Sequence, residues 1–332
     1  MNPESRKSDG SDAVATLIRA GGRREAPPES AYRTVLAVAE SALQAKLRRR
    51  RWRRLGVALA AAAALCVLSV ALYQRTQPAL SLPVAVPVAG VDRLDGVVEA
   101  RSSADEDWVL LDSSRQLPRG SLVRTGRGSG VGLLMQRHLS LRVAADTEIE
   151  LTDAALVRLL RGAIYVDAAP DAKDRLFVAT PLGTARHDGT QFELRYEPPR
   201  LQLRVREGRV YLDRESGPVQ AATGESLLIT ADGQIERSRI PTHDARWQWT
   251  QSLAPMPDFD ERPVRELLQW VARQTGRQLR YAGPAAEQRA ATAILHGRLS
   301  RLAPDEALTV ALATTDLSVD LQDEDRIVIG TR

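Results

Sequence analysis

The amino-acid sequence predicts a mainly β protein that carries a small α/β module at its C-terminus and one transmembrane helix near its N-terminus. A charge-free apolar run spans residues 55–73 and follows a dense block of arginines. Short β-like runs recur about every ten residues from 94 to 239, which is typical of an all-β domain. From residue 257 onward the apolar spacing changes to the helical period. The 332 residues suffice for two modest domains plus extensions.

Composition excludes two kinds of site, and the charge distribution separates the N-terminal tail from the rest of the chain. The single cysteine, Cys66, falls inside the apolar run, so the sequence predicts neither a disulfide framework nor a cysteine-bearing metal site. Residues 1–54 hold 13 of the 46 basic residues and 6 of the 42 acidic ones, a net charge of +7. Residues 55–73 carry no charged side chain, so the remainder holds 33 basic and 36 acidic residues, a net charge of −3. The basic character is therefore local to the N-terminal tail.

Residues 1–54 are expected to form a basic, helical cytoplasmic tail that is too small to fold alone. Asp12 is placed to cap a short helix that ends near Gly21, and Ser30 is placed to cap a second, longer helix. An isolated amphipathic stripe usually needs a partner, so the second helix is interpreted as a docking helix for another protein. The alternative is a juxtamembrane helix that rests on anionic lipid. The apolar stripe consists of Tyr32, Val35, Leu36, Ala39 and Leu43.

Residues 55–73 are predicted to be a transmembrane helix, because about 19 apolar residues just span a hydrocarbon core of roughly 30 Å. Positively charged flanks favour the cytoplasmic side, so the N-terminus is expected in the cytoplasm and the C-terminus in the periplasm of a bacterial inner membrane. A cleaved signal peptide would need a far shorter preceding segment, and a core helix seldom follows such a basic block. Nucleic acid binding by that block is the other alternative. The flanking residues are Arg48, Arg49, Arg50, Arg51, Arg53 and Arg54, with Trp52 among them at interfacial depth.

Residues 74–92 contain three prolines and are expected to be an extended linker. Residues 93–240 then form the predicted all-β domain, a stack of short strands. Glu207-Gly208 and Asp232-Gly233 are acidic-glycine pairs of the kind that favour tight hairpin turns, and Arg161-Gly162 is a weaker candidate. The glycines between 126 and 132 do not fit a nucleotide-binding loop, because a strand rather than a helix follows them.

No pattern in the sequence indicates an enzyme, a cofactor or a metal site. The four histidines lack ligand spacing, and no nucleophile elbow, zinc-protease motif or phosphate loop occurs. The acidic residues Asp258, Asp260 and Glu261 are better explained by solvation or by the charge of a helix N-terminus. The histidines are His138, His187, His243 and His296.

Residues 245–332 are expected to form the α/β module, built from two short β-α-β units. In the first unit Val264, Leu267, Leu268 and Val271 share one helical face, Gly276 ends the helix, and residues 277–281 form a strand. In the second unit residues 294–300 form a strand and Pro304 opens a helix. The segments LSVDL and IVIG close the module as a hairpin. Trp247 and Trp249, at the junction, are expected either to lie on a partner-binding surface or to be buried between the two domains.

Between residues 156 and 212, the segment VATPLGTARHDGTQFELR is followed by LRVREGRVYL. These segments resemble the core of the FecR-type family of inner-membrane sigma regulators. The family pattern is roughly V-x-T-P-x-G, then G-T-x-F, then a strand, E-G and another strand. The upstream segment LPRGSLVRTGRGSGVGLLM also resembles the family's opening. The residues that match the pattern are Thr180, Pro181, Gly183, Gly189, Thr190, Phe192, Glu207 and Gly208.

The C-terminal module resembles the short N-terminal signalling module of secretins and TonB-dependent receptors, which FecR-type proteins also carry. Together the two resemblances imply a relay that controls an extracytoplasmic-function sigma factor on the cytoplasmic side. They imply a TonB-dependent outer-membrane transducer, or another envelope protein, as the periplasmic partner. The tail departs from the family, since its only tryptophan is Trp52. The alternative function is therefore a periplasmic scaffold or sensor that the helix merely anchors.

The resemblance also implies a reaction of the chain on itself. Some FecR-type proteins are split at the Gly-Thr bond, which here is Gly189-Thr190. Attack of the threonine hydroxyl on the preceding carbonyl would give an ester that water opens. The alternative is that Gly189 supplies a bend and Thr190 a β-branched strand residue.

Overall fold

The computed structural model describes residues 15–18, 20–21, 69, 87–103, 105–135, 139–169, 175–299, 302–321 and 323–332. The predicted docking helix, the flanking arginines and the predicted membrane helix lie outside the described residues, except for Ser69. The chain divides into two compact units, Met1–Ser81 and Leu82–Arg332. Residues 15–18 of the first unit are helical, and Leu17 and Ile18 are exposed. Among the described residues no helix combines the length and the apolar character needed to cross a bilayer.

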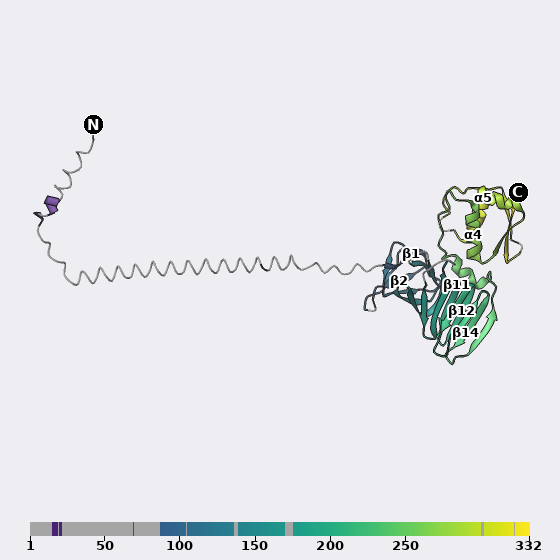
Figure 1. The fold of residues 1–332 in the computed structure, drawn as a ribbon, viewed down its shortest axis with the longest axis horizontal. Helices are drawn as coiled ribbons and strands as arrows, with labels where there is room; N and C mark the ends of the chain where they lie inside the picture. Colours follow the sequence, from purple (N-terminus) through teal and green to yellow (C-terminus); the bar gives the residue numbers. More distant parts are fainter. Residues whose placement is uncertain are drawn as a thin grey trace, which may run out of the picture. The chain divides into compact units, whose positions relative to one another are not determined.

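The β domain, residues 87–239, is one hydrogen-bonded sheet of 15 strands, drawn in blue to green in Figure 1. The main path runs β15-β14-β12-β11-β10-β9-β7-β6-β1-β4; β13 pairs with β12, and β3, β2, β5 and β8 form a branch that joins β9. The prediction of a mainly β fold is confirmed. The strands are β1 (Pro87–Asp95), β2 (Val98–Arg101), β3 (Val109–Leu110), β4 (Gln116–Pro118), β5 (Ser121–Thr125), β6 (Gly130–Met135), β7 (Ser140–Val143), β8 (Glu148–Asp153), β9 (Leu156–Asp167), β10 (Phe177–Thr180), β11 (Gly183–Glu197), β12 (Arg200–Asp213), β13 (Val219–Ala222), β14 (Glu225–Thr230) and β15 (Ile235–Arg239).

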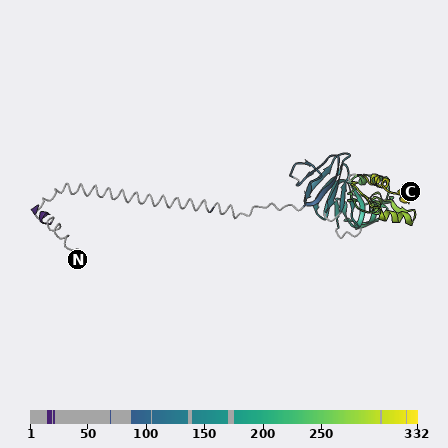
Figure 2. The ribbon, with the colours of Figure 1, turned by 90° about the horizontal axis from the view of Figure 1, so that it is seen from above.

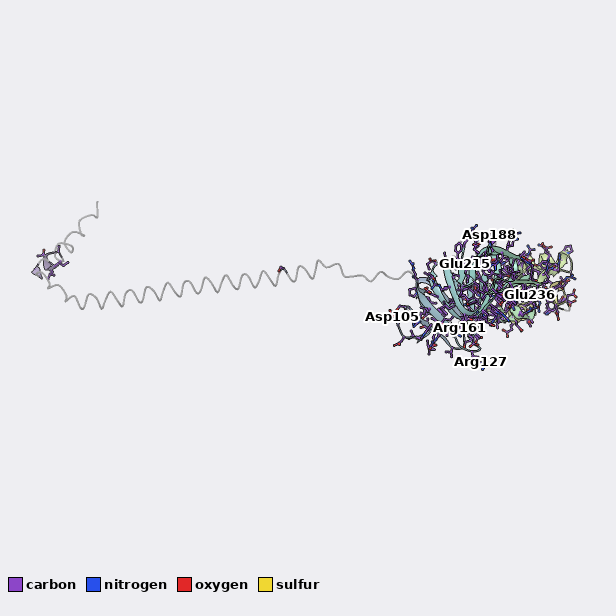
Figure 3. All side chains as sticks on the ribbon, turned by 90° about the horizontal axis from the view of Figure 1, so that it is seen from below. Asp105, Arg127, Arg161, Asp188, Glu215 and Glu236 are labelled. Atoms are coloured by element: carbon purple, nitrogen blue, oxygen red, sulfur yellow. The ribbon has the colours of Figure 1, made fainter. Side chains whose placement is uncertain are left out.

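The core of the β domain consists of the inward-facing aliphatic side chains of these strands. Leu141 and Val143 in β7, Ile164 in β9, Leu194 in β11 and Leu203 in β12 are all fully buried in one cluster. Their two-residue spacing is the period of a strand, so one face of each strand supplies the core. Charged side chains such as Asp188, Glu215 and Glu236 project from the surface of the β domain (Figure 3).

Two predicted turns are wrong, because the strands run straight through them. Gly162 lies inside β9 and Gly208 lies inside β12, each with a positive φ, so the glycines make local irregularities and not hairpin turns. The turn at Asp232-Gly233 is confirmed, since it joins β14 to β15 and Gly233 has a φ of +87°. Residues 87–92, the end of the predicted linker, lie in β1.

The C-terminal module, residues 257–332, has its own core and a small sheet in the order β16-β18-β17. The β16–β18 pair is parallel and the β17–β18 pair is the predicted antiparallel hairpin. The predicted face of α4 is confirmed, because Val264, Leu267, Leu268 and Val271 are all fully buried. The elements are α4 (Val264–Thr275), β16 (Gln278–Tyr281), α5 (Pro284–Thr292), α6 (Pro304–Ala313), β17 (Leu317–Asp320) and β18 (Arg326–Thr331).

The second predicted β-α-β unit differs from the structure. The described residues of the predicted strand at 294–300 make only one isolated bridge, between Ile294 and Pro263. Helix α5 was not predicted, because it buries only small side chains, Ala286 and Ala290, and so shows no stripe of large apolar residues.

A connector, residues 240–256, joins the β domain to the C-terminal module. It contains the 3-10 helix η2 (Ala245–Trp247) and the short helix α3 (Gln248–Gln251). Figures 1 and 2 show the C-terminal module packed against the β domain on the side of the connector. Both parts belong to one compact unit, Leu82–Arg332, and the candidate functional site lies where they contact each other.

Candidate functional site

The residues of the predicted family pattern gather at two places in the β domain. Thr180, Pro181 and Gly183 form the turn between β10 and β11, where the Thr180 hydroxyl donates to the Gly183 carbonyl over 2.8 Å. The other place lies farther along β11, where Gly189 and Thr190 face Gly208 of β12. We call the second place the signature bulge, defined by Gly189, Thr190, Glu207 and Gly208.

The signature bulge is an irregularity shared by β11 and β12. Asp188 pairs with Arg209 and Gln191 pairs with Glu207, so two residues of β11 stand opposite the single residue Gly208. Gly208 has a φ of +84°, and a Cβ atom there would lie 2.5 Å from Thr190 Cγ2 and 2.9 Å from the Gly189 carbonyl oxygen. Glycine is therefore required at 208 for two reasons, its backbone conformation and the closeness of Thr190.

Buried polar groups surround this bulge. Thr190 is fully buried, and its Oγ1 has no hydrogen-bond partner among the described residues. The backbone carbonyl of Thr190 accepts from the amide of Ala168 over 3.0 Å. His187 Nε2 accepts from the amide of Leu176 over 3.2 Å, and burial lowers the pKa of His187 to about 4. The imidazole beside the bulge is thus neutral at pH 7.

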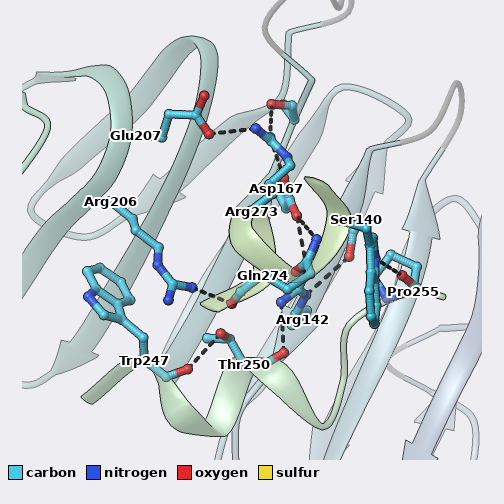
Figure 4. Close-up of polar contacts among 12 residues, drawn as sticks. Ser140, Arg142, Asp167, Arg206, Glu207, Trp247, Thr250, Pro255, Arg273 and Gln274 are labelled. Carbon is cyan, nitrogen blue, oxygen red and sulfur yellow. Dashed lines mark hydrogen bonds and ion pairs between the residues drawn. The ribbon is translucent and has the colours of Figure 1, made fainter. Parts of the chain in front are cut away.

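A second group of buried polar residues lies between the β domain and the C-terminal module. We call it the junction cluster: Arg142, Asp167, Arg206, Arg273 and Gln274 (Figure 4). The Arg142 side chain is fully buried; its guanidinium donates to Asp167 Oδ2 over 3.0 Å and to Gln274 Oε1 over 2.6 Å. Gln274 Nε2 donates in turn to Asp167 Oδ2 over 3.1 Å. The guanidinium of Arg142 in β7, the carboxylate of Asp167 in β9 and the side-chain amide of Gln274 in α4 are therefore hydrogen-bonded to one another.

Arg273 of α4 extends this network to the signature bulge. Its guanidinium donates to Asp167 Oδ1 over 2.7 Å and to the Ala168 carbonyl over 3.0 Å. The same group donates to Glu207 Oε2 over 2.5 Å. Glu207 is a residue of the family pattern, so the C-terminal module contacts the signature bulge directly.

The C-terminal end of α4 faces a cation of the β domain, Arg206. Arg206 donates to the backbone carbonyl of Gln274 over 2.9 Å and to the carbonyl of Thr242 over 2.6 Å. Gly276 ends α4 in the left-handed conformation, and a Cβ atom there would lie within 2.5 Å of Arg206 Nε. A cation at a helix C-terminus is favourable because the last carbonyls carry partial negative charge.

Two tryptophans of the connector cover the same face of the sheet. Trp247 is fully buried against Tyr165, with ring centroids 5.9 Å apart in an edge-to-face arrangement. Trp249 is half-buried, and its indole N–H donates to Glu193 Oε2 over 3.0 Å. Glu193 is itself fully buried and also accepts from Arg204 over 2.6 Å. Of the two placements expected for the tryptophans, the structure shows burial for Trp247 and partial burial for Trp249.

The arginines of the junction cluster lower the pKa of its carboxyl group, Asp167. Burial by itself would raise the pKa of the Asp167 carboxyl, but Arg142 and Arg273 outweigh burial and hold that pKa below its usual value of 3.8. Asp167 is therefore ionised at neutral pH, as its two arginine partners require. Groups of three or more His, Cys, Asp or Glu side chains suited to a metal ion are absent from the described part of the chain.

The sequence did not point to the junction cluster. Arg142 lies in LSLRV and Asp167 in AIYVD, and both occupy the strand positions that alternate with core residues. Such positions are normally solvated in an antiparallel sheet. Here the connector and α4 cover that face, so the polar residues become buried. The presence of Tyr165 in the same strand, and of two tryptophans in the connector, was the only signal of a covered face.

Part of the β domain is similar to a known protein family. Residues 121–211 match the family model described as FecR protein. No curated protein matches the chain. Two crystal structures of a candidate anti-sigma factor from Parabacteroides distasonis ATCC 8503, at 2.50 and 1.65 Å resolution, are similar to 64% of this chain and to 98% and 99% of their own chains. Both are 16% identical to it, with a TM-score of 0.35. The segment that matches the FecR family model, residues 121–211, includes the whole signature bulge.

Proposed function

We propose that this chain is a FecR-like regulator that relays a signal to an extracytoplasmic-function sigma factor. The observation that carries the proposal is the match of residues 121–211 to the FecR family, with all eight pattern residues inside the matched range. The chain binds its partners and transmits a change between them, which requires no catalytic centre. It acts either by restraining the sigma factor or by activating it.

The proposed location is a bacterial inner membrane, crossed once by residues 55–73. The support is the uncharged apolar run with its arginine-rich N-terminal flank. In this arrangement residues 1–54 are cytoplasmic and hold the sigma factor through the stripe from Tyr32 to Leu43. The FecR-type domain and the C-terminal module are periplasmic.

The C-terminal module is the proposed receiver of the signal. Its three-stranded sheet and three helices follow a FecR-type domain, the position that a secretin/TonB-receptor-like signalling module takes in the family. An outer-membrane TonB-dependent transducer is the proposed partner. Strand addition at an open edge of the small sheet, β16 or β17, is one physical route for its binding.

A capture experiment tests the proposal. Tagged residues 1–54 are expected to retain a sigma factor from an extract of the source organism, identified by mass spectrometry. The matched control carries Leu36→Glu and Leu43→Glu, which place charges in the apolar stripe and should abolish retention. If the wild-type tail retains no sigma factor while the full-length chain retains an envelope protein, the scaffold function is supported instead.

We also propose that the chain is cleaved at Gly189-Thr190. Gly189 has a φ of +51°, and the Thr190 hydroxyl is buried without a partner among the described residues, so it is free to act as a nucleophile. Its oxygen would bond to the Gly189 carbonyl carbon as the C–N bond breaks, and the proton would pass to the leaving Thr190 amine. Water would then open the ester to give a Gly189 carboxylate and the free hydroxyl.

Immunoblotting of full-length protein tests the cleavage. Two fragments are expected for the wild type and one intact band for Thr190→Ala. The control, Thr184→Ala, alters a threonine of the same strand outside the bulge and should leave cleavage intact. Intact wild-type protein would show that the bulge has a structural role only.

A further inference from the structure

Four neighbouring strands align one residue each in a row beneath α4. Ser140 of β7 pairs with Asp167 of β9, Asp167 pairs with Gln191 of β11, and Gln191 pairs with Glu207 of β12. Gln191 directly follows Thr190, so the row runs along the edge of the signature bulge. The carboxylates of Asp167 and Glu207 therefore stand on the two strands that flank β11.

Arg273 connects these two flanking strands. One of its terminal nitrogens donates to Asp167 and to the Ala168 carbonyl, and the other donates to Glu207. The guanidinium thus spans from β9 to β12 across β11. Its planar fork suits two separate acceptors, and the hydrogen bonds are charge-assisted. The side chain is 27% exposed and Asp167 only 7%, so the bridge is shielded from most of the solvent on the β9 side.

Other contacts restrain the bulge on the β12 side, where the Gly208 amide donates to Thr223 Oγ1 over 2.9 Å and the Gly208 carbonyl accepts from the Thr223 amide over 3.0 Å. In β11 the register shifts between Asp188 and Gln191 and again between Gln191 and Phe192, which interrupts the regular ladder to β12. On the β9 side, the Thr190 carbonyl accepts from the amide of Ala168, the residue whose own carbonyl is bound by Arg273. Removing Arg273 would therefore take a contact away from each of the two strands that flank the bulge.

We propose that Arg273 is a positioning residue through which the C-terminal module holds the signature bulge in place. A protein that binds the C-terminal module and shifts α4 would loosen the pairing around Gly189-Thr190. Binding at the module and the conformation of the bulge are then coupled through one side chain. This coupling does not depend on which partner the cytoplasmic tail binds.

Hydrogen exchange of the purified, uncleaved full-length chain, followed by mass spectrometry, tests the proposal. Arg273→Gln is expected to speed the exchange of amides in residues 187–192 on the order of tenfold, the effect of losing a charge-assisted hydrogen bond. The matched control is Arg262→Gln, which removes an exposed pair with Glu266 at the start of the same helix. The control should leave exchange at the bulge unchanged. Exchange in residues 264–271 should be unchanged in both variants, which shows that α4 stays folded.

A second variant separates the bridge from the docking of the whole module. Glu207→Gln removes one end of the bridge and leaves the contacts with Asp167 and Ala168, so it should speed exchange at the bulge by less than Arg273→Gln. The double variant should exchange no faster than Arg273→Gln alone, since both changes act on one contact. The proposal is overturned if Arg273→Gln leaves exchange at 187–192 at the wild-type rate. It is also overturned if the increase is spread evenly over the β domain. Because the readout is exchange, sigma-factor binding does not affect either result.

Discussion

At the scale of single residues, the junction cluster is stable because its buried charges are paired. The Arg142 side chain has no exposed surface, and removing a charge from water costs several kcal/mol unless a partner compensates. Asp167 supplies the countercharge, while Gln274 and the carbonyl of Thr250 complete the hydrogen bonds of the guanidinium. The buried Arg142 guanidinium therefore depends on Asp167 and Gln274 for its countercharge and hydrogen bonds.

Replacing Asp167 by alanine should lower the free energy of unfolding by about 3–5 kcal/mol, because it leaves Arg142 buried without its carboxylate. Denaturant-induced unfolding followed by fluorescence measures the change. The control is Glu148→Ala, which removes a more exposed pair with Arg161 and should cost less than about 1 kcal/mol. Equal effects of the two substitutions would show that the cluster adds no special stability.

His187 should make stability depend on pH. Burial lowers its pKa to about 4 in the folded protein, whereas the unfolded chain has the ordinary pKa of about 6.5. Between these values the unfolded chain binds a proton that the folded protein does not, so the free energy of unfolding falls as pH falls. The two pKa values correspond to a loss of about 3 kcal/mol from pH 7 to pH 4.

Urea unfolding of wild type and of His187→Gln at several pH values measures this contribution. Glutamine cannot titrate, so the variant should lose less stability over this window than the wild type. His296→Gln, at an exposed position, is the control and should follow the wild-type curve. Parallel curves for wild type and His187→Gln would contradict the expected role of burial.

At the scale of elements, the signature bulge depends on glycine at one position. Gly208→Ala would force a side chain into a φ of +84° and into contact with Thr190. The backbone conformation alone costs about 1–2 kcal/mol, and the contact adds to it. The control is Gly233→Ala, whose φ is +87° but whose Cβ would meet nothing within 4 Å. Thermal unfolding should therefore show a larger loss of stability for Gly208→Ala, and equal losses would indicate that the bulge can relax around a methyl group.

The sequence predicted the strands and the helix α4 well, because alternation and the 3.6-residue period are local signals. It failed at Gly162 and Gly208, since an acidic or basic residue followed by glycine has the same local composition in a turn and in a bulge. The family pattern placed Gly189 and Glu207 in one list, but only the register of β11 and β12 shows that they belong to one bulge. Bulges and registers depend on partner strands, which a local pattern does not contain.

At the scale of the whole molecule, the β domain and the C-terminal module have separate apolar cores and a shared polar junction. The junction could not be predicted, because it depends on which face of the sheet the connector covers. Contacts from Arg142, Asp167 and Arg206 to α4 tie the two parts together, and Trp247 packs at their border. We expect these contacts to make the β domain and the C-terminal module behave as one rigid body.

Native-state hydrogen exchange of the full-length chain in low concentrations of denaturant tests most directly whether the β domain and the C-terminal module behave as one body. Amides of α4 in the C-terminal module and of β9 in the β domain should open with the same free energy, within about 1 kcal/mol, because undocking would expose the buried charges of the junction. The same denaturant dependence is expected for both sets of amides. If α4 opens several kcal/mol below β9, the two parts move independently and the junction does not transmit force between them.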